Sequence, residues 1–148
     1  MDVVFEQCDP ALPPASELIE AVLAEFDATM GRRLRGGPSA TPDELSPPAG
    51  AYVVGFAGDQ PACGGGIKDL GDGVAELKRM YVVPQFRGRG VARQLLESLE
   101  ALATDLGYQA IRLDSWSPSK GFYVRAGYEE IPDYNDNPHA EFWCEKRL

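Results

Sequence analysis

The feature that most constrains the fold is a glycine-rich turn, Gln85-Phe86-Arg87-Gly88-Arg89-Gly90-Val91-Ala92. A strand-like segment at residues 75–83 precedes it, closed by Pro84, and an amphipathic helix predicted to reach Leu106 follows it. A turn between a strand and a helix leaves several backbone N–H groups without partners, and the helix dipole adds about half a positive charge at the same end. Glycine has no Cβ to keep a phosphate away from the backbone. The turn is therefore predicted to bind a pyrophosphate.

Size and composition favour one soluble domain. The chain has 148 residues, of which 44% are hydrophobic and 25% charged. No apolar run approaches the roughly 20 residues that span a bilayer, and the N-terminus lacks the pattern of a signal peptide. Cys8, Cys63 and Cys144 have no CxxC spacing, which argues against a disulfide framework and a zinc site and fits a reducing compartment. We expect a cytoplasmic single-domain protein over residues 1–148, with no metal and no membrane partner.

The charge of the chain is unevenly distributed. A net charge of -9 disfavours nonspecific nucleic-acid binding, so no nucleic-acid partner is expected. An acidic surface is compatible with a cationic partner, although it also serves solubility alone. The basic residues gather around the predicted phosphate turn: Lys78, Arg79, Arg87, Arg89 and Arg93.

Hydrophobic periodicity and turn residues predict an α/β fold. Strands are expected at residues 2–7, 51–57, 61–70, 75–83, 110–116, 128–131 and 140–146. Helices are expected at residues 17–28, 91–106 and 118–126, with a short one at 30–34. The three strands between residues 51 and 83 are joined by short turns and must be antiparallel, whereas the helix at 91–106 forms a crossover. Gly64-Gly65-Gly66 indicates a bulge or a close approach by another group.

The segment at residues 36–50 is rich in glycine, proline, serine and alanine. Neither flank is large enough to stand alone, so the segment is a loop and not a domain linker. Two interpretations stay open for it, a tolerated surface insertion and a lid on the substrate side.

Three kinds of phosphate-binding turn have glycine-rich sequences comparable to this one. A P-loop requires a lysine–hydroxyl pair that this chain lacks. A dinucleotide-binding turn fits Gly88 and Gly90, and Asp114 lies 24 residues after Gly90, near the expected acidic position. However, Arg93 occupies the third glycine position, and the antiparallel strands upstream leave no room for a doubly wound sheet.

The third kind accounts for more of the chain. Gln85-x-x-Gly88-x-Gly90 resembles the pyrophosphate signature of the GNAT family of N-acetyltransferases, which use acetyl-CoA. Glu76-Leu-Lys-Arg-Met-Tyr-Val-Val-Pro84 is similar to the family's fourth strand, and Gly121-Phe-Tyr-Val-Arg-Ala-Gly127-Tyr128 to its second conserved helix and following strand. The order of elements matches the family over the whole chain. The resemblance implies a mixed, mostly antiparallel sheet of about six or seven strands with helices on both faces.

The resemblance also implies the cofactor contacts. Backbone N–H groups of Met80, Tyr81 and Val82 would bind pantetheine and the thioester oxygen, with Val82 the expected oxyanion donor. The pyrophosphate would bind to the turn, at Arg87, Gly88, Arg89, Gly90, Val91 and Ala92. Many family members carry an asparagine and an alanine before the last helix, where this chain has Ser-Trp-Ser-Pro-Ser-Lys at residues 115–120.

Two catalytic residues follow from the resemblance. Tyr123 matches a tyrosine near the cofactor sulfur and is the candidate general acid, because a phenol pKa of about 10 exceeds that of a thiol. The alternative is an aromatic that only packs. Glu76 matches a glutamate that accepts the amine proton in relatives that acetylate histones. The alternative is an ion-pair partner for a residue such as Lys78 or Arg79.

The alternation of side chains along a strand predicts on which face of the sheet Glu76 lies. With a period of two, Glu76, Lys78, Met80 and Val82 share a face unless a bulge intervenes. Glu76 would then lie on the side of the oxyanion donor.

The implied activity is direct acetyl transfer to a primary amine in a ternary complex. The alternative function is an idle acyl-CoA-binding or sensor domain. The acceptor is a small-molecule or peptidyl amine, and the acidic chain favours a cationic one. Tyr134, Asn135 and Asp136 are placed on the acceptor side.

Other chemistry-bearing residues receive weaker roles. His139, the one histidine, is expected to be solvated and not a base. Cys63 and Cys144 are expected to be core residues, because direct transfer needs no acyl-enzyme. The strand containing Phe142 and Trp143 offers an edge for a homodimer.

Overall fold

The computed structural model describes residues 1–31 and 37–148. The helices and strands are β1 (Val4–Gln7), α1 (Ala15–Met30), β2 (Ala51–Ala57), β3 (Gln60–Gly71), β4 (Val74–Val82), α2 (Val91–Asp105), β5 (Ala110–Ser115), α3 (Lys120–Arg125), β6 (Glu129–Ile131) and β7 (Phe142–Arg147). Two 3-10 turns, η1 (Pro84–Phe86) and η2 (Ser117–Ser119), precede α2 and α3. The helix predicted over 30–34 lies mainly outside the described residues. None of the helices in the described ranges has the length and apolar character needed to cross a membrane.

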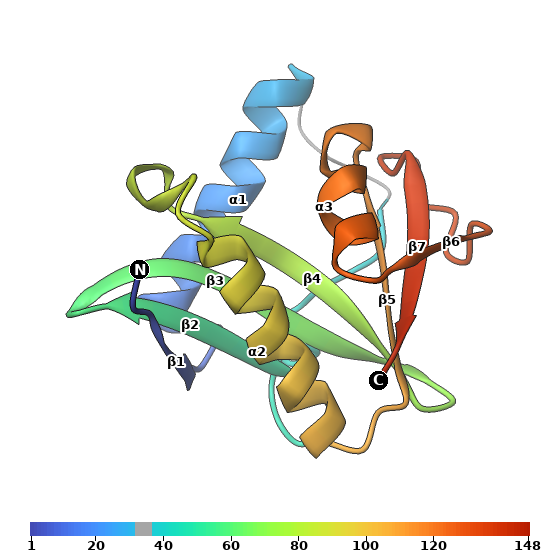
Figure 1. Ribbon diagram of the computed structural model, residues 1–148, viewed down its shortest axis with the longest axis horizontal. Coiled ribbons are helices and arrows are strands. Elements are labelled where there is room, and N and C mark those ends of the chain that lie inside the picture. Colours follow the sequence, from blue (N-terminus) through green and yellow to red (C-terminus); the bar gives the residue numbers. More distant parts are fainter. Residues whose placement is uncertain (32–36) are drawn as a thin grey trace.

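One seven-stranded sheet runs through these residues in the order β1-β2-β3-β4-β5-β7-β6 (Figure 1). The predicted antiparallel arrangement of β2, β3 and β4 is confirmed. β4 and β5 are parallel and are joined by the crossover helix α2, because parallel neighbours cannot be linked by a tight turn. The remaining pairs are antiparallel, so the sheet is mixed and mostly antiparallel, as expected.

The helices bury apolar stripes on opposite faces of the sheet. Leu95, Leu99 and Ala103 of α2 are fully buried against one face, which α2 crosses in Figure 1. On the other face Leu18 of α1 packs with Tyr52 of β2. Burial of a leucine side chain contributes about 2 kcal/mol, so these two layers hold the helices in place.

The loop ahead of β2 adds to the α1 side. Leu45 is completely buried in the α1 cluster. Lys68 of β3 ties the loop to the sheet, because its Nζ lies 3.1 Å from Oε2 of Glu44 and donates to the Ser39 carbonyl at 2.8 Å. The described part of the loop is therefore a packed cover of this face.

A β-bulge interrupts the pairing of β3 with β4. Gly66 pairs with Lys78 and Gly64 with Tyr81, so Arg79 and Met80 together oppose one residue. Arg79 takes a φ of 58°, which is unusual for a residue with a side chain. A Cβ on Gly64 would lie 2.3 Å from the Tyr52 hydroxyl, which explains the glycine. Both predicted features of the glycine run, a bulge and a close approach, are present.

The bulge reverses the alternation of β4. Lys78 lies opposite Gly66, which faces Leu45 on the α1 side. Met80 and Val82, beyond the bulge, pack into the α2 cluster. Glu76 was expected to share a face with Val82 unless a bulge intervened; the bulge is present, and the extra residue turns the second half of the strand over, so the two side chains lie on opposite faces.

β4 and β5 pair over only a short length. Their register joins Val74, Ala75 and Glu76 to residues 110–112 and extends no further. β5 remains paired with β7 over residues 110–115. The two central strands therefore separate beyond Glu76, and a wedge opens in the middle of the sheet (Figure 1).

The homodimer edge predicted at Phe142 and Trp143 is wrong. β7 lies inside the sheet, where Trp143 pairs with Asp114 on one side and with Ile131 on the other. Phe142 is buried. A strand that already has two neighbours offers no free backbone edge to a partner.

Candidate active site

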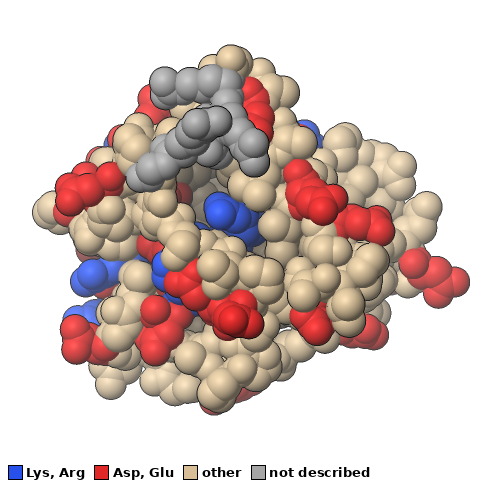
Figure 2. All heavy atoms as spheres, turned by 180° about the vertical axis from the view of Figure 1, so that it is seen from behind, with Lys and Arg blue, Asp and Glu red and all other residues tan. Residues whose placement is uncertain are grey.

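A cavity of about 650 Å³ occupies the region where β4 and β5 separate. Its walls come from β4, β5, the C-terminal half of α1, the residues at 37 and 38, the start of α3 and the loop before β7. Among the described residues, Lys78 and Arg79 are the lysine and arginine side chains of its lining. Figure 2 shows lysine or arginine atoms recessed in the face seen from behind, with acidic residues around them.

The glycine turn lies at the N-terminus of α2. Gly88 and Gly90 both have a φ of 77°, and Gly90 is the residue that caps the helix. A Cβ on either glycine would meet nothing within 4 Å. Glycine is therefore needed for the backbone conformation, and the space above each residue is open to a ligand.

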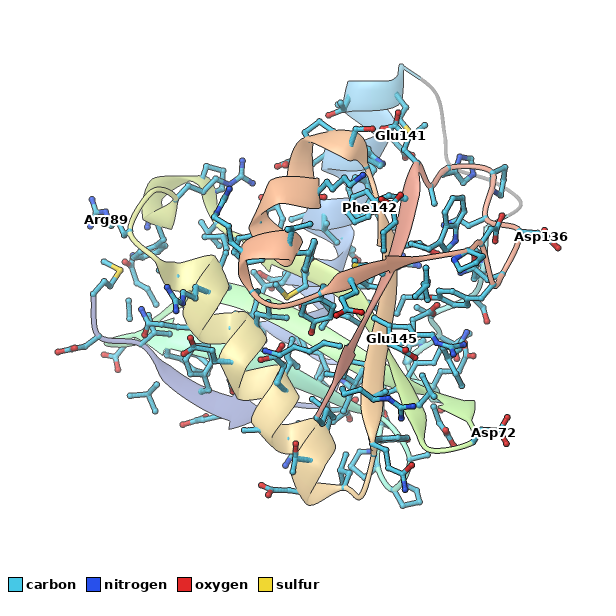
Figure 3. All side chains as sticks on the ribbon, turned by 45° about the vertical axis from the view of Figure 1, so that its right-hand side comes forward. Asp72, Arg89, Asp136, Glu141, Phe142 and Glu145 are labelled. Carbon is cyan, nitrogen blue, oxygen red and sulfur yellow. The ribbon has the colours of Figure 1, made fainter. Side chains whose placement is uncertain are left out.

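Backbone donors gather in this turn. Among the described residues, the N–H groups of residues 88–92 find no acceptor, and the first backbone bond of the helix runs from Gln94 to the Gly90 carbonyl. Arg89 is exposed, makes no ion pair within the described ranges, and projects from the turn in Figure 3. Free donors, a helix N-terminus and a free guanidinium suit phosphate oxygens.

Arg87 points elsewhere. Its backbone N–H donates to the Pro84 carbonyl at 3.2 Å. Its side chain donates to the Val82 carbonyl and to Oε2 of Glu25, each at 2.8 Å, and its guanidinium lies over the Tyr81 ring. The structure therefore does not bring Arg87 into the donor set of the turn. It fastens the turn to β4 and α1.

The backbone of β4 turns alternate N–H groups toward the wedge. Val83 donates to the Ala62 carbonyl of β3 at 2.9 Å. Because hydrogen bonding alternates along an antiparallel strand, Tyr81 also faces β3, whereas Met80 and Val82 face the opposite edge. The predicted donors Met80 and Val82 therefore meet the wedge, and the predicted donor Tyr81 does not.

Tyr123 lies in the wall of the cavity, near the start of α3. Its side chain is 7% exposed and packs edge-on against Phe122 and Tyr128. Within the described ranges its hydroxyl has no hydrogen-bond partner. Burial, followed by the nearby Cys144 thiol, raises the pKa of Tyr123, so the phenol stays protonated at neutral pH.

Glu76 lies behind the cavity wall. Its side chain is 1% exposed, and its Oε2 accepts hydrogen bonds from the Tyr134 hydroxyl at 2.5 Å and from Nδ2 of Asn135 at 3.4 Å. Its Oε1 lies 3.2 Å from Nζ of Lys78, an ion pair without the geometry of a hydrogen bond. The ion-pair partner that the sequence left as the alternative is thus present.

Asp114 is a cavity residue for which the sequence predicts no role, beyond its spacing in the rejected dinucleotide interpretation. It lines the cavity from β5 and accepts hydrogen bonds from Nδ2 of Asn135 and Nδ2 of Asn137. The Nε1–H of Trp143 donates to Oδ1 of Asn135 at 2.9 Å and so orients its amide toward the carboxylates. The period of β5 places Arg112 and Asp114 on one face, and this alternation could have predicted a polar side of the strand at Asp114.

The loop before β7 divides the predicted acceptor residues. Tyr134 and Asn135 point inward to Glu76 and Asp114. Asp136 is exposed at a φ of 53°, projects outward in Figure 3 and is not among the residues that line the cavity, so its predicted place on the acceptor side stays a prediction. His139, expected to be solvated, is only partly exposed and lines the cavity.

Aromatic and hydroxyl groups complete the wall near α3. Phe26 of α1 contacts Trp116 with ring centroids 5.0 Å apart, and both line the cavity. The hydroxyls of Ser115 and Ser119 lie 2.7 Å apart where the family places asparagine and alanine.

The two cysteines behind these walls are unreactive core residues. Burial raises the pKa of Cys63 to about 11, and burial with the charges of Glu130 and Asp114 raises that of Cys144 to about 12. A thiol that remains protonated at neutral pH is a poor nucleophile.

Comparisons with known proteins agree with this geometry. A family model described as an acetyltransferase (GNAT) domain matches residues 48–130. The uncharacterised N-acetyltransferase YjgM of Escherichia coli K12 is 32% identical, over 92% of this chain and 86% of its own length. A putative acyl-CoA N-acyltransferase from Klebsiella pneumoniae, 23% identical, superposes with a TM-score of 0.77 over 99% of this chain and 97% of its own.

The PaiA N-acetyltransferase of Thermoplasma acidophilum, solved in complex with coenzyme A, is 19% identical and superposes over the full length of both chains with a TM-score of 0.73. At such identities the superpositions establish the fold, and the family model with the Escherichia coli relative establishes the family. The chain belongs to the GNAT acetyltransferase family.

Proposed function

We propose that this protein transfers the acetyl group of acetyl-CoA directly to a primary amine in a ternary complex. The observation that carries the proposal is the wedge between β4 and β5. Beyond the point of separation β4 runs into the donor-rich turn at Gly88, and the cavity beside the separated strands lies under the C-terminal half of α1. A cofactor on the turn and an acceptor under α1 would therefore approach each other from opposite sides.

Backbone groups of this chain would hold the cofactor. The N–H groups of residues 88–92 suit the pyrophosphate, and those of Met80 and Val82 suit pantetheine and the thioester oxygen. The PaiA N-acetyltransferase of Thermoplasma acidophilum, which shares this fold, is solved in complex with coenzyme A, and this supports the assignment. Tyr81 and Arg87 support the strand and the turn from behind.

The chemistry is a single displacement. The neutral amine attacks the thioester carbonyl, the C–N bond forms, and the C–S bond breaks as negative charge passes to sulfur. The Val82 N–H would stabilise the oxyanion, and the Tyr123 hydroxyl would donate its proton to the leaving thiolate.

The amine must lose a proton during the reaction, and two carboxylates compete for this role. Glu76 is the residue that the sequence predicted, and it is buried beneath Lys78 and Tyr134. Asp114 lies on the cavity wall. We assign the contact with the amine to Asp114 and a positioning role to Glu76, whose predicted role as base stays a prediction.

The transferase is tested by thiol release. Acetyl-CoA is mixed with a panel of amines of low molecular mass and with lysine-containing peptides, and free CoA thiol is measured against hydrolysis without acceptor. We expect at least one amine to raise release well above that background. Acetyl-CoA binding with no amine-dependent release would instead identify an idle acyl-CoA-binding domain.

The phosphate turn is tested by Gly88→Glu. A carboxylate at this position would repel a pyrophosphate, and acetyl-CoA affinity measured by calorimetry should fall by about two orders of magnitude. Gly58→Glu is the matched control, because Gly58 also has a positive φ with open space above it. Both variants should lose about 1–2 kcal/mol of stability through backbone strain. Equal acetyl-CoA affinity in the two variants would refute the placement.

The general acid is tested by Tyr123→Phe. Because the pKa of Tyr123 is raised, its acid form persists above pH 10, and the wild-type kcat should show no basic decline from this group between pH 7 and 9. The variant should lose about 100-fold in kcat with little change in acetyl-CoA affinity. Tyr128→Phe is the control, since its hydroxyl donates to Glu100 and does not line the cavity. If Tyr123→Phe retains the wild-type kcat, Tyr123 is not the general acid and contributes only packing.

The variants Glu76→Gln and Asp114→Asn distinguish the roles of the two carboxylates. Glu76→Gln leaves the Lys78 ammonium buried without its counter-charge, so its free energy of unfolding should fall by about 3 kcal/mol. Asp114→Asn should be less destabilising and should lower kcat/KM for the acceptor. Denaturant unfolding and pH–rate profiles measure both. If Glu76→Gln keeps its stability and loses the acid limb of the profile, Glu76 is the base.

A further inference from the structure

Arg79 occupies an unusual place in the wall of the cavity. It is the bulged residue of β4, held at a φ of 58°, and its partly buried side chain lines the cavity. Such a backbone conformation costs energy for a residue with a side chain and persists where the surroundings impose it. Arg79 therefore interrupts the regular alternation of side chains between the two faces of β4, at the point where that alternation reverses.

Among the described residues, the guanidinium of Arg79 has no hydrogen-bond or ion-pair partner. Within the described ranges it makes no hydrogen bond and no ion pair, and its Nε is fully enclosed. By contrast, Lys78 pairs with Glu76, and Arg112 with Glu145. A guanidinium carries five N–H donors, and enclosing even the one on Nε without an acceptor is costly. Burial accordingly lowers the pKa of Arg79, partly offset by the charges of Asp114 and Glu76.

We propose that Arg79 is a specificity-determining residue that binds a carboxylate of the acceptor, which is therefore an amino-acid-like amine. This inference rests on the proposed acetyl transfer. Arginine and carboxylate match in a bidentate pair, which would satisfy donors that the protein leaves free.

The carboxylate belongs to the acceptor and not to the cofactor. The donors that suit the cofactor phosphates lie on the turn at Gly88, whereas Arg79 interacts electrostatically with Asp114 and Glu76 on the α1 side of the sheet. Asp114 lines the same cavity and would receive the ammonium of a zwitterion. The rings of Phe26 and Trp116 would receive an apolar side chain.

Matched acceptors test the proposal. Phenylalanine, phenylalaninamide and phenethylamine, with the corresponding set for leucine, differ only in the group beside the amine. Thiol release should give the free amino acid at least a tenfold higher kcat/KM than its amide or its decarboxylated amine. Arg79→Gln should lower kcat/KM for the amino acid by about 10- to 100-fold and leave that for the decarboxylated amine unchanged.

Three controls accompany this variant. Arg79→Lys keeps the charge without the planar fork and should recover part of the loss. Arg147→Gln removes an exposed arginine at the end of β7 and should leave every acceptor unchanged. Acetyl-CoA affinity should be the same in all these variants, which separates carboxylate binding from cofactor binding.

A binding measurement decides the inference without turnover. N-acetylphenylalanine and N-acetylleucine are titrated by calorimetry into the protein saturated with CoA. Binding that Arg79→Gln weakens about tenfold or more supports the proposal. Absence of binding, or binding equal in wild type and variant, overturns it. Efficient acetylation of amines with and without a carboxylate also overturns the role of Arg79, although it supports the acetyltransferase activity. Binding of the N-acetyl amino acids without any turnover would refute the acetyltransferase activity alone.

Discussion

The separation of two parallel strands in the middle of the sheet is the constraint on which the site depends. β4 remains paired with β3 and β5 remains paired with β7. The edges of β4 and β5 that face each other pair at three positions only. Backbone groups on the opened edges lack the partners that a continuous sheet would supply, and buried backbone groups rarely remain unpaired. The wedge is therefore a ready place for an extended ligand that carries its own donors and acceptors. The crossover through α2 places a helix N-terminus at its mouth.

A second constraint, the bulge at Arg79, sorts the residues of β4 between the two faces. Before it, Glu76 and Lys78 belong to the polar cluster under α1, and after it Met80 and Val82 pack toward α2. One extra residue thus lets a single strand supply both the side chains under α1, where we propose that the acceptor binds, and the backbone groups that we propose hold the cofactor. Tyr52 and Leu45 crowd the glycines opposite, so the small residues of β3 are part of the same arrangement.

Sequence reasoning succeeded where the signals were local. The strand boundaries, the crossover, the positive-φ glycines and the position of Tyr123 follow from periodicity, turn chemistry and a family motif. Features that depend on strand register and on contacts between residues distant in the sequence could not be predicted. The glycine run predicts a bulge but not where it falls in β4, so the strand period alone could not decide whether Glu76 and Val82 share a face. Asn135 reaches Asp114 across 21 residues and Tyr134 reaches Glu76 across 58, and no local pattern encodes such contacts.

Net charge was the least informative signal about the acceptor, for a physical reason. The value of -9 sums mainly exposed groups, which bulk water screens within about 8–10 Å. Inside the cavity the dielectric is lower, and a single unpaired guanidinium counts for more than several solvated carboxylates. An acidic surface is therefore compatible with a cavity wall that carries charges of both signs, and the groups that we propose contact the acceptor, Arg79 and Asp114, decide its chemistry. An acceptor carrying both charges would neutralise each of them at the least cost in desolvation.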